Sequence, residues 1–265
     1  TMKRTVTFGE IMLRLKTPEH MRILQTDAFE ASYGGAEANV AVSLAVLKDP
    51  VSFVTKLPEN PVGTAALNEV RRYGADTSKV VIGGSRLGIY FFEKGTDIRP
   101  TNVVYDREGS ALALAKPEEF HWDEILKDTD IFYFSGVTPA VSENIAKAVL
   151  EALKYCKAHG IETVCDLNYR SKMWDTKKAQ SVMSELMNYV TLRIANDEDF
   201  ESSLGIHAYD GDISKGIDQI ESYKAGMKEI QNRYPNCKAV ASVLRNMYTA
   251  EDGDWMAIYL KDGVF

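Results

Sequence analysis

The chain has 265 residues, and its 31 Lys and Arg against 38 Asp and Glu leave a formal net charge of -7. Hydrophobic residues make up 45% and charged residues 26%, a balance that excludes disordered and fibrous proteins. The acidic character disfavours binding to nucleic acid, which draws on clustered Lys and Arg. The length suits one large α/β domain, and we expect no nucleic-acid partner.

No apolar run approaches the roughly 20 residues of a membrane-spanning helix, and no secretory signal precedes the first predicted strand. We therefore expect no membrane partner. The three cysteines, Cys156, Cys165 and Cys237, are widely spaced and form no CxxC pair. An odd number of scattered cysteines indicates buried free thiols in a reducing compartment, so we predict a cytoplasmic protein.

Strand-like and helix-like segments alternate along the chain. In chain order, we predict strands over residues 6–15, 51–56, 130–135, 161–167, 191–195 and 238–243, and helices over residues 36–48, 61–74, 142–159, 177–189 and 214–234. Asn60 and Gly160 are typical helix caps, and the acidic run Asp197 to Asp199 favours the first turn of a further helix. This alternation predicts βαβ units and a three-layer α/β/α fold with a mostly parallel sheet.

One region breaks the alternation. Residues 88–92 and 102–105 are both strand-like, and a turn containing Gly and Pro joins them without a helix. We predict a hairpin that leaves the main sheet and forms a small β lid from about residues 11–33 and 87–110. A lid over a ligand and an edge hairpin without ligand contacts fit this pattern equally well.

Several standard active-site motifs are absent from the sequence. It contains no GxxxxGK[ST] phosphate loop, no GxGxxG dinucleotide motif and no GxSxG nucleophile elbow. The four histidines show no metal-ligand spacing, which argues against a structural zinc site. A nicotinamide-dependent oxidoreductase therefore ranks low.

Polar residues at predicted strand and loop ends are the remaining candidates for a site. Gly34 and Gly35 precede a helix that carries Asn39, where backbone approaches a ligand closely and N–H groups are free. Asn168 and Arg170 follow one predicted strand and Asn196 follows the next, at the edge where α/β sheets bind ligands. Helix caps and a surface Arg explain each position separately, but two successive strand ends that carry Asn favour a site.

Tyr105 and Arg107 lie two residues apart on a predicted strand, so both side chains point to one face, and Tyr90 on the partner strand can join them. Two phenols and a guanidinium suit a small hydroxylated acid. Aromatic residues on strands more often serve packing, which is the alternative reading of these positions.

Taken together, these segments resemble the ribokinase-like (pfkB) carbohydrate kinase family over essentially the whole chain. The residues that carry the resemblance are Gly34-Gly35-Ala36-Glu37-Ala38-Asn39-Val40-Ala41, residues 56–63, residues 71–76 and Asp166-Leu167-Asn168-Tyr169-Arg170. Residues 7–15 and 105–111 resemble those of 2-keto-3-deoxygluconate kinases in particular. The resemblance implies one ribokinase-like domain over residues 1–265 and ATP-dependent, Mg²⁺-assisted phosphorylation of a sugar acid, most simply of 2-keto-3-deoxygluconate to its 6-phosphate.

The resemblance also implies roles for individual residues. The expected substrate-binding residues are Gly34, Gly35, Asn39, Tyr90, Tyr105, Arg107 and Arg170. The expected ATP-binding residues are Asn168, Arg170, Asn196, Ser242 and Arg245, the last two in a segment where the family forms a nucleotide loop. Asp199 stands where the family has Glu in an N-x-x-E motif, which implies an indirect role in organising Mg²⁺.

The family's Gly-Ala-Gly-Asp motif, which holds the transferring phosphoryl group and the catalytic base, does not occur before Phe265. We therefore assign no catalytic base and expect a truncated copy that is severely impaired. A fructokinase or other neutral-sugar kinase, and a non-catalytic sugar-binding protein, remain as alternatives. The resemblance further implies a homodimer or higher oligomer formed through the β lid.

Overall fold

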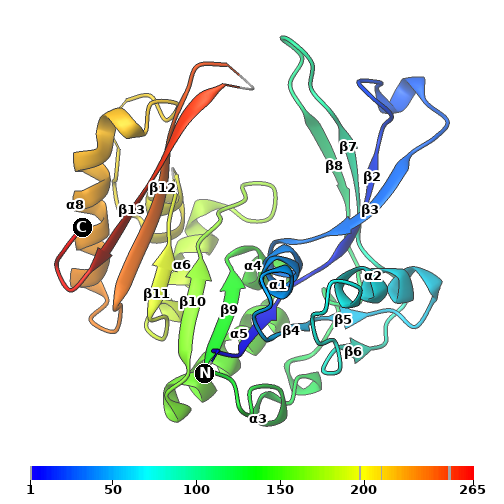
Figure 1. Ribbon diagram of the computed structural model, residues 1–265, viewed down its shortest axis with the longest axis horizontal. Helices are drawn as coiled ribbons and strands as arrows, with labels where there is room; N and C mark the ends of the chain where they lie inside the picture. The colour runs from blue at the N-terminus through cyan, green and yellow to red at the C-terminus, as the bar shows by residue number, and fades with distance from the viewer. Residues whose placement is uncertain (1, 197, 210, 250–251) are drawn as a thin grey trace. The chain divides into compact units, whose positions relative to one another are not determined.

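The computed structural model describes residues 2–196, 198–209, 211–249 and 252–265 (Figure 1). Asp197, which belongs to the predicted acidic helix turn, lies outside the described residues. The chain forms two compact units, Thr1–Thr129 and Asp130–Phe265. In the described part of the chain, no helix combines the length and the apolar character needed to cross a bilayer.

The first unit begins with a parallel strand pair. β1 (Thr5–Phe8) pairs with β4 (Val51–Val54), and α1 (Ala36–Val46) packs against both strands. α2 (Pro61–Arg71) starts as predicted, because the Asn60 side chain accepts a hydrogen bond of 2.9 Å from the Gly63 N–H. The remaining elements of this part are β5 (Lys56–Leu57), β6 (Val81–Ile82), η2 (Pro117–Glu119) and α3 (Trp122–Ile125).

The prediction of one strand over residues 6–15 is wrong. The segment contains two strands in different sheets, β1 and β2 (Met12–Lys16), separated by Gly9, Glu10 and Ile11. The backbone of this break lies tightly against α1 and the loop before it: a Cβ on Gly9 would stand 2.1 Å from a carboxylate oxygen of Glu37. Close packing at the break, which the hydrophobic pattern does not reveal, redirects the chain into the lid.

The β lid is a separate four-stranded sheet of this unit, with strand order β3-β2-β7-β8 (Figure 1). β3 (Glu30–Gly34) and η1 (Ile23–Gln25) follow β2, and β7 (Ile89–Glu93) and β8 (Asn102–Asp106) form the predicted hairpin. The central pair, β2 and β7, is parallel. Both segments thus contribute strands to one sheet.

The second unit alternates strands and helices as predicted. β9 (Ile131–Ser135), β10 (Glu162–Asp166), β11 (Leu192–Ile194) and β12 (Ala239–Met247) pair in parallel, and β13 (Gly253–Lys261) pairs antiparallel with β12. The helices are α4 (Val137–Val141), α5 (Glu143–His159), α6 (Thr176–Leu186), α7 (Asp199–Leu204) and α8 (Ile220–Arg233). Gly160 ends α5 at φ 68°, a conformation that glycine adopts without strain.

Two predictions for this unit are wrong. The helix predicted over residues 214–234 is interrupted: Ser214 is held by Asp212, and a short 3-10 turn, η3 (Ile217–Gln219), precedes α8. The segment expected to form a nucleotide loop, Ser242 to Asn246, lies inside β12, where β13 supplies its hydrogen-bond partners. The strand continues through Ser242 to Asn246 because these residues pair with β13, a contact with a later segment that the residues themselves do not indicate.

The three cysteines are free and buried, as predicted. Burial raises the pKa of the Cys156 thiol to about 12, so this group stays a protonated, unreactive thiol at neutral pH.

Candidate active site

One face of the lid carries most of the polar candidates, and the strand register defines it. Arg14 on β2 lies opposite Tyr90 on β7, and Tyr90 lies opposite Tyr105 on β8. Residues opposite each other on neighbouring strands share a face of the sheet. On β3 this same face carries Ser32, Gly34 and Glu30. We call it the polar face of the lid; it contains Arg14, Lys16, Glu30, Ser32, Gly34, Tyr90, Phe92, Tyr105 and Arg107.

The two predicted tyrosines are neighbours on this face. The ring centroids of Tyr90 and Tyr105 are 5.9 Å apart. Tyr90 is half-buried, and burial raises the pKa of its phenol while the nearby Arg14 guanidinium opposes that rise. The Tyr90 phenol is therefore neutral at pH 7 and is able to donate and accept hydrogen bonds.

Arg107 extends the same face by two residues, and its guanidinium is held by a buried carboxylate. The guanidinium carbon lies 5.7 Å from the centre of the Tyr105 ring, as expected for side chains on one face. Its Nη2 donates to Glu10 Oε1 at 2.5 Å, and the Glu10 side chain is only 4% exposed. The hydroxyl of Ser110 donates to the other oxygen of Glu10 at 2.6 Å. Glu10 and Ser110 thus fix the orientation of Arg107.

The glycine pair joins this face to α1. A Cβ on Gly34 would meet Asn39 Oδ1 at 3.5 Å and the Tyr90 hydroxyl at 3.9 Å, so these three predicted residues lie together. Gly35 has a different role, because a Cβ there would stand 1.9 Å from the carbonyl oxygen of Glu10. The backbone of Gly35 is extended, a conformation that any residue adopts. Glycine is required at this position because the Glu10 carbonyl leaves no room for a Cβ atom.

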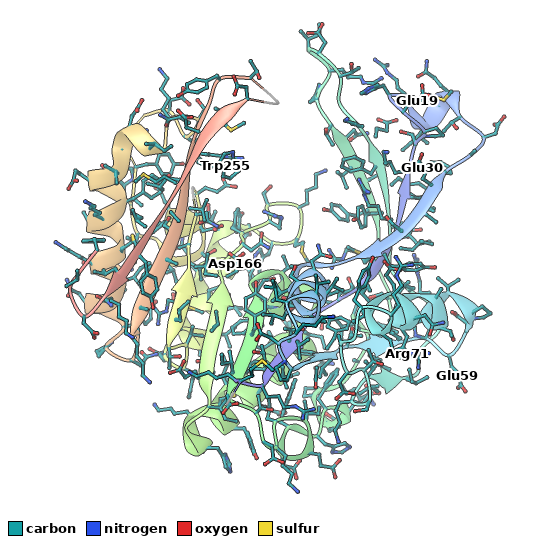
Figure 2. All side chains as sticks on the ribbon, viewed as in Figure 1. Glu19, Glu30, Glu59, Arg71, Asp166 and Trp255 are labelled. Carbon is teal, nitrogen blue, oxygen red and sulfur yellow. The ribbon has the colours of Figure 1, made fainter. Side chains whose placement is uncertain are left out.

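The second unit places the other candidates at the carboxyl ends of β10 and β11. Asp166 ends β10 (Figure 2), and Asn168 follows it in the left-handed region at φ 40°. Asp199 joins the two strand ends, since its carboxylate accepts hydrogen bonds from the Tyr169 N–H at 2.8 Å and the Asn196 N–H at 3.0 Å. One buried carboxylate therefore organises the turns after both strands.

Burial raises the pKa of Asp199 to about 6. The two backbone N–H donors oppose this rise, the carboxylate of Asp166 adds to it, and the guanidinium of Arg170 opposes it. Arg170 itself is exposed and donates to the Tyr169 carbonyl at 3.2 Å. Asp166, Asp199 and Arg170 thus form one electrostatic group.

The remaining residues predicted to bind ATP make contacts within the protein. The side-chain oxygen of Asn196 accepts a hydrogen bond of 2.7 Å from the Val243 N–H, which ties the end of β11 to β12. Ser242 is fully buried, and its hydroxyl donates to the Ala195 carbonyl. Arg245 lies in β12 with its guanidinium 5.8 Å from the ring of Trp255. The role of Ser242 as an ATP contact stays a prediction that its burial does not support.

The fit of these residues to Mg²⁺ is indirect. Both carboxylate oxygens of Asp199 are occupied by backbone N–H groups, so Asp199 orders the backbone rather than offering a direct ligand. In the described residues, no group of three or more His, Cys, Asp or Glu side chains is arranged to hold a metal ion. Mg²⁺ bound to phosphates keeps several waters and needs few protein ligands, so this arrangement is compatible with a nucleotide-bound ion.

Comparison with known proteins identifies the family. The model of the pfkB family carbohydrate kinases matches residues 2–235. The chain belongs to the pfkB family of carbohydrate kinases. Its fold is the ribokinase-like α/β fold with a mostly parallel central sheet, as predicted.

Individual relatives narrow the comparison. A 2-dehydro-3-deoxygalactonokinase of Haloferax volcanii is 38% identical over 207 residues, which cover 78% of this chain and 64% of that protein. The crystal structure of a 2-dehydro-3-deoxygluconokinase from Thermotoga maritima is 44% identical, with a TM-score of 0.92 over 99% of this chain and 78% of that one. A putative Ribokinase II from E. coli, solved with ATP and Mg²⁺, shares the fold at 15% identity, with a TM-score of 0.76 over 96% of this chain and 78% of that one.

Sequence reasoning missed three residues of the lid site: Glu10, Arg14 and Ser110. The alternation of polar and apolar residues in β2 puts Arg14 and Lys16 on the face away from Leu13 and Leu15, and this signal was available. The hydrogen bond between Glu10 and Arg107 joins positions 97 residues apart, and no local sequence pattern predicts it.

The two glycines provide a matched pair of substitutions. Gly35→Ala forces a Cβ into the Glu10 carbonyl and is expected to lower the free energy of unfolding by about 3 kcal/mol. In Gly34→Ala the added Cβ meets its neighbours at ordinary contact distance, so the free energy of unfolding is expected to change by less than about 0.5 kcal/mol. Urea denaturation followed by circular dichroism measures both; equal effects would contradict the distinction.

The raised pKa of Asp199 predicts a pH-dependent stability. The folded chain binds this proton more tightly than the unfolded chain, whose Asp titrates near pH 4. As pH rises from about 4 to 6, the wild type should therefore lose stability relative to Asp199→Asn, by at most about 1.4 kcal/mol per pH unit. Urea denaturation of both proteins at half-unit pH steps measures the difference. A stability difference that is constant from pH 4 to 7 would show that Asp199 titrates normally.

Proposed function

We propose that this chain binds ATP and a 2-keto-3-deoxy sugar acid, and that the protein is a kinase that phosphorylates the terminal hydroxyl of the acid. The observation that carries the proposal is the polar face of the lid, where two phenols adjoin a guanidinium held by a buried carboxylate. The relatives named for 2-dehydro-3-deoxy sugar acids, at 38% and 44% identity, support the substrate class. The chain spans 64% of the length of the Haloferax relative, so the activity of the whole protein is part of the proposal.

The lid residues bind the sugar acid. The Tyr90 and Tyr105 phenols hydrogen-bond its hydroxyl groups, and Gly34 leaves room for it beside Asn39. Arg107 donates to the acid from an orientation that Glu10 holds. Such prior orientation lowers the entropy that binding costs. The role of Arg170 as a substrate contact stays a prediction, based on the suitability of its guanidinium for an anionic group.

The carboxyl ends of β10 and β11 bind the nucleotide. Asn168, Arg170 and Asn196 lie there, and Asp199 fixes the backbone that carries them. When bound, ATP with Mg²⁺ supplies the phosphoryl group and neutralises the charge of the phosphates. The likeness to a fold solved with ATP and Mg²⁺ supports this choice. The catalytic base, expected in a Gly-Ala-Gly-Asp motif, stays unassigned.

Two further properties belong to the proposal. The buried free cysteines favour a cytoplasmic location, since a reducing compartment keeps such thiols unpaired.

The apolar face of the lid, opposite its polar face, favours a homodimer. Leu15, Phe91 and Val104 share this apolar face, and the rings of Phe91 and Phe29 are 5.7 Å apart. Val104 is 45% exposed, an apolar surface that a second copy can cover.

Substrate choice is tested by calorimetric binding and by a coupled assay of ADP formation. The expected result is that 2-keto-3-deoxygluconate or its galactonate epimer binds and is the preferred acceptor, whereas fructose is not. Arg107→Ala should weaken binding of the acid by about 10- to 100-fold, because a hydrogen bond to a charged group is lost. ATP binding should change by less than about twofold.

Three results would overturn this assignment. Strong turnover of fructose without turnover of the ketodeoxy acids would point to a neutral-sugar kinase. Sugar binding without ATP binding would point to a non-catalytic sugar-binding protein. An equal loss of ATP and acid binding in Arg107→Ala would remove Arg107 from the sugar-acid site.

The dimer is tested by sedimentation velocity on a matched pair of variants. Val104 and Val103 are adjacent on β8, so their side chains lie on opposite faces of the lid. Val104→Lys should convert a wild-type dimer to a monomer at micromolar concentration, and Val103→Lys should leave it intact. A monomeric wild type, or equal dissociation of both variants, would contradict a lid-mediated dimer.

A further inference from the structure

Three cationic side chains stand on the polar face of the lid, and two of them are neutralised by carboxylates. Arg107 pairs with the buried Glu10 at 2.5 Å. Lys16 pairs across the strands with Glu30 at 3.1 Å, and Glu30 is labelled on β3 in Figure 2. Each of these cations therefore adds little net charge to the face.

Arg14 is the third cation, and its surroundings differ. It occupies the middle of the face, with Ser32 opposite it on β3 and Tyr90 opposite it on β7. Its guanidinium carbon lies 4.3 Å from the centre of the Phe92 ring. Within the described residues, no Asp or Glu forms an ion pair with Arg14. The positive charge in the centre of the face is thus left uncompensated.

The position of this charge suits a small anion. Arg14 is half-buried, and its effect on the pKa of Tyr90 shows that its field reaches the phenol. The ring of Phe92 shields one side of the guanidinium, a contact that tolerates the charge without neutralising it. Guanidinium N–H groups match a carboxylate in a two-point arrangement, and partial burial strengthens that interaction.

We propose that Arg14 is the residue that makes this site select an acid over a neutral sugar. Its guanidinium pairs with the substrate carboxylate beside Tyr90, whereas Arg107, balanced by Glu10, serves as an oriented hydrogen-bond donor. This inference rests on the proposed sugar-acid function and adds to it the side chain that binds the carboxylate of the acid.

The test compares an acid with its uncharged derivative. The ligands are 2-keto-3-deoxygluconate and its methyl ester, and the measurement is the Kd of each by isothermal titration calorimetry. Arg14→Met should weaken binding of the acid by about 10- to 100-fold and binding of the ester by less than about twofold. Arg14→Lys, which keeps a charge but not the planar fork, should fall between wild type and Arg14→Met for the acid.

Lys16→Met is the matched control. It removes one positive charge from the same strand and the same face, at a position already paired with Glu30. A general effect of net charge would weaken acid binding equally in both variants, whereas the proposal expects less than about a twofold change in Lys16→Met. Raising the salt concentration should weaken acid binding to the wild type more than to Arg14→Met.

The outcomes separate this inference from the proposed function. A wild type that binds neither 2-keto-3-deoxygluconate nor its galactonate epimer overturns both the proposed function and the role of Arg14. A wild type that binds the acid, with Arg14→Met binding it equally well or losing acid and ester alike, overturns only the role of Arg14. Thermal unfolding shows whether each variant is folded. If Arg14→Met fails to fold, Arg14→Gln takes its place, and the same comparison of acid and ester decides.

Discussion

The contact between Glu10 and Arg107 is the interaction on which the lid site depends. It joins the break after β1 to the end of β8, two points 97 residues apart, and it places a carboxylate with 4% exposure against a guanidinium with 18%. Loss of one partner of such a buried pair leaves a desolvated charge, which costs about 3–5 kcal/mol. Gly35 lies on the carbonyl of Glu10, so the glycine loop, the buried carboxylate and the arginine form one packed unit.

Buried carboxylates organise the candidate residues of the lid and those of the second unit by the same physical means. Glu10 accepts hydrogen bonds from a guanidinium and a hydroxyl, and Asp199 accepts them from two backbone N–H groups that follow different strands. A carboxylate removed from water needs donors, and only a few backbone and side-chain arrangements supply them. Each carboxylate therefore selects one local geometry for the groups that we propose contact substrate.

Charge on the lid is arranged by pairing rather than by abundance. The chain is acidic overall, yet the polar face carries Arg14, Lys16 and Arg107 close together. Partners on neighbouring strands or loops neutralise two of these three cations. A count of charges in the sequence cannot distinguish a paired cation from an unpaired one, because the partners become neighbours only when the sheet forms.

Local patterns in the sequence determined the α/β alternation, the capped starts and ends of α2 and α5, and the common face of Tyr105 and Arg107, because period, capping chemistry and pleat act over a few residues. Tertiary structure decided the break of residues 6–15 into two sheets, the strand in place of a loop at Ser242 to Asn246, and the partners of Arg107 and Asp199. Each of these depends on contacts between segments far apart in the chain, where packing and the desolvation of charge outweigh local preference.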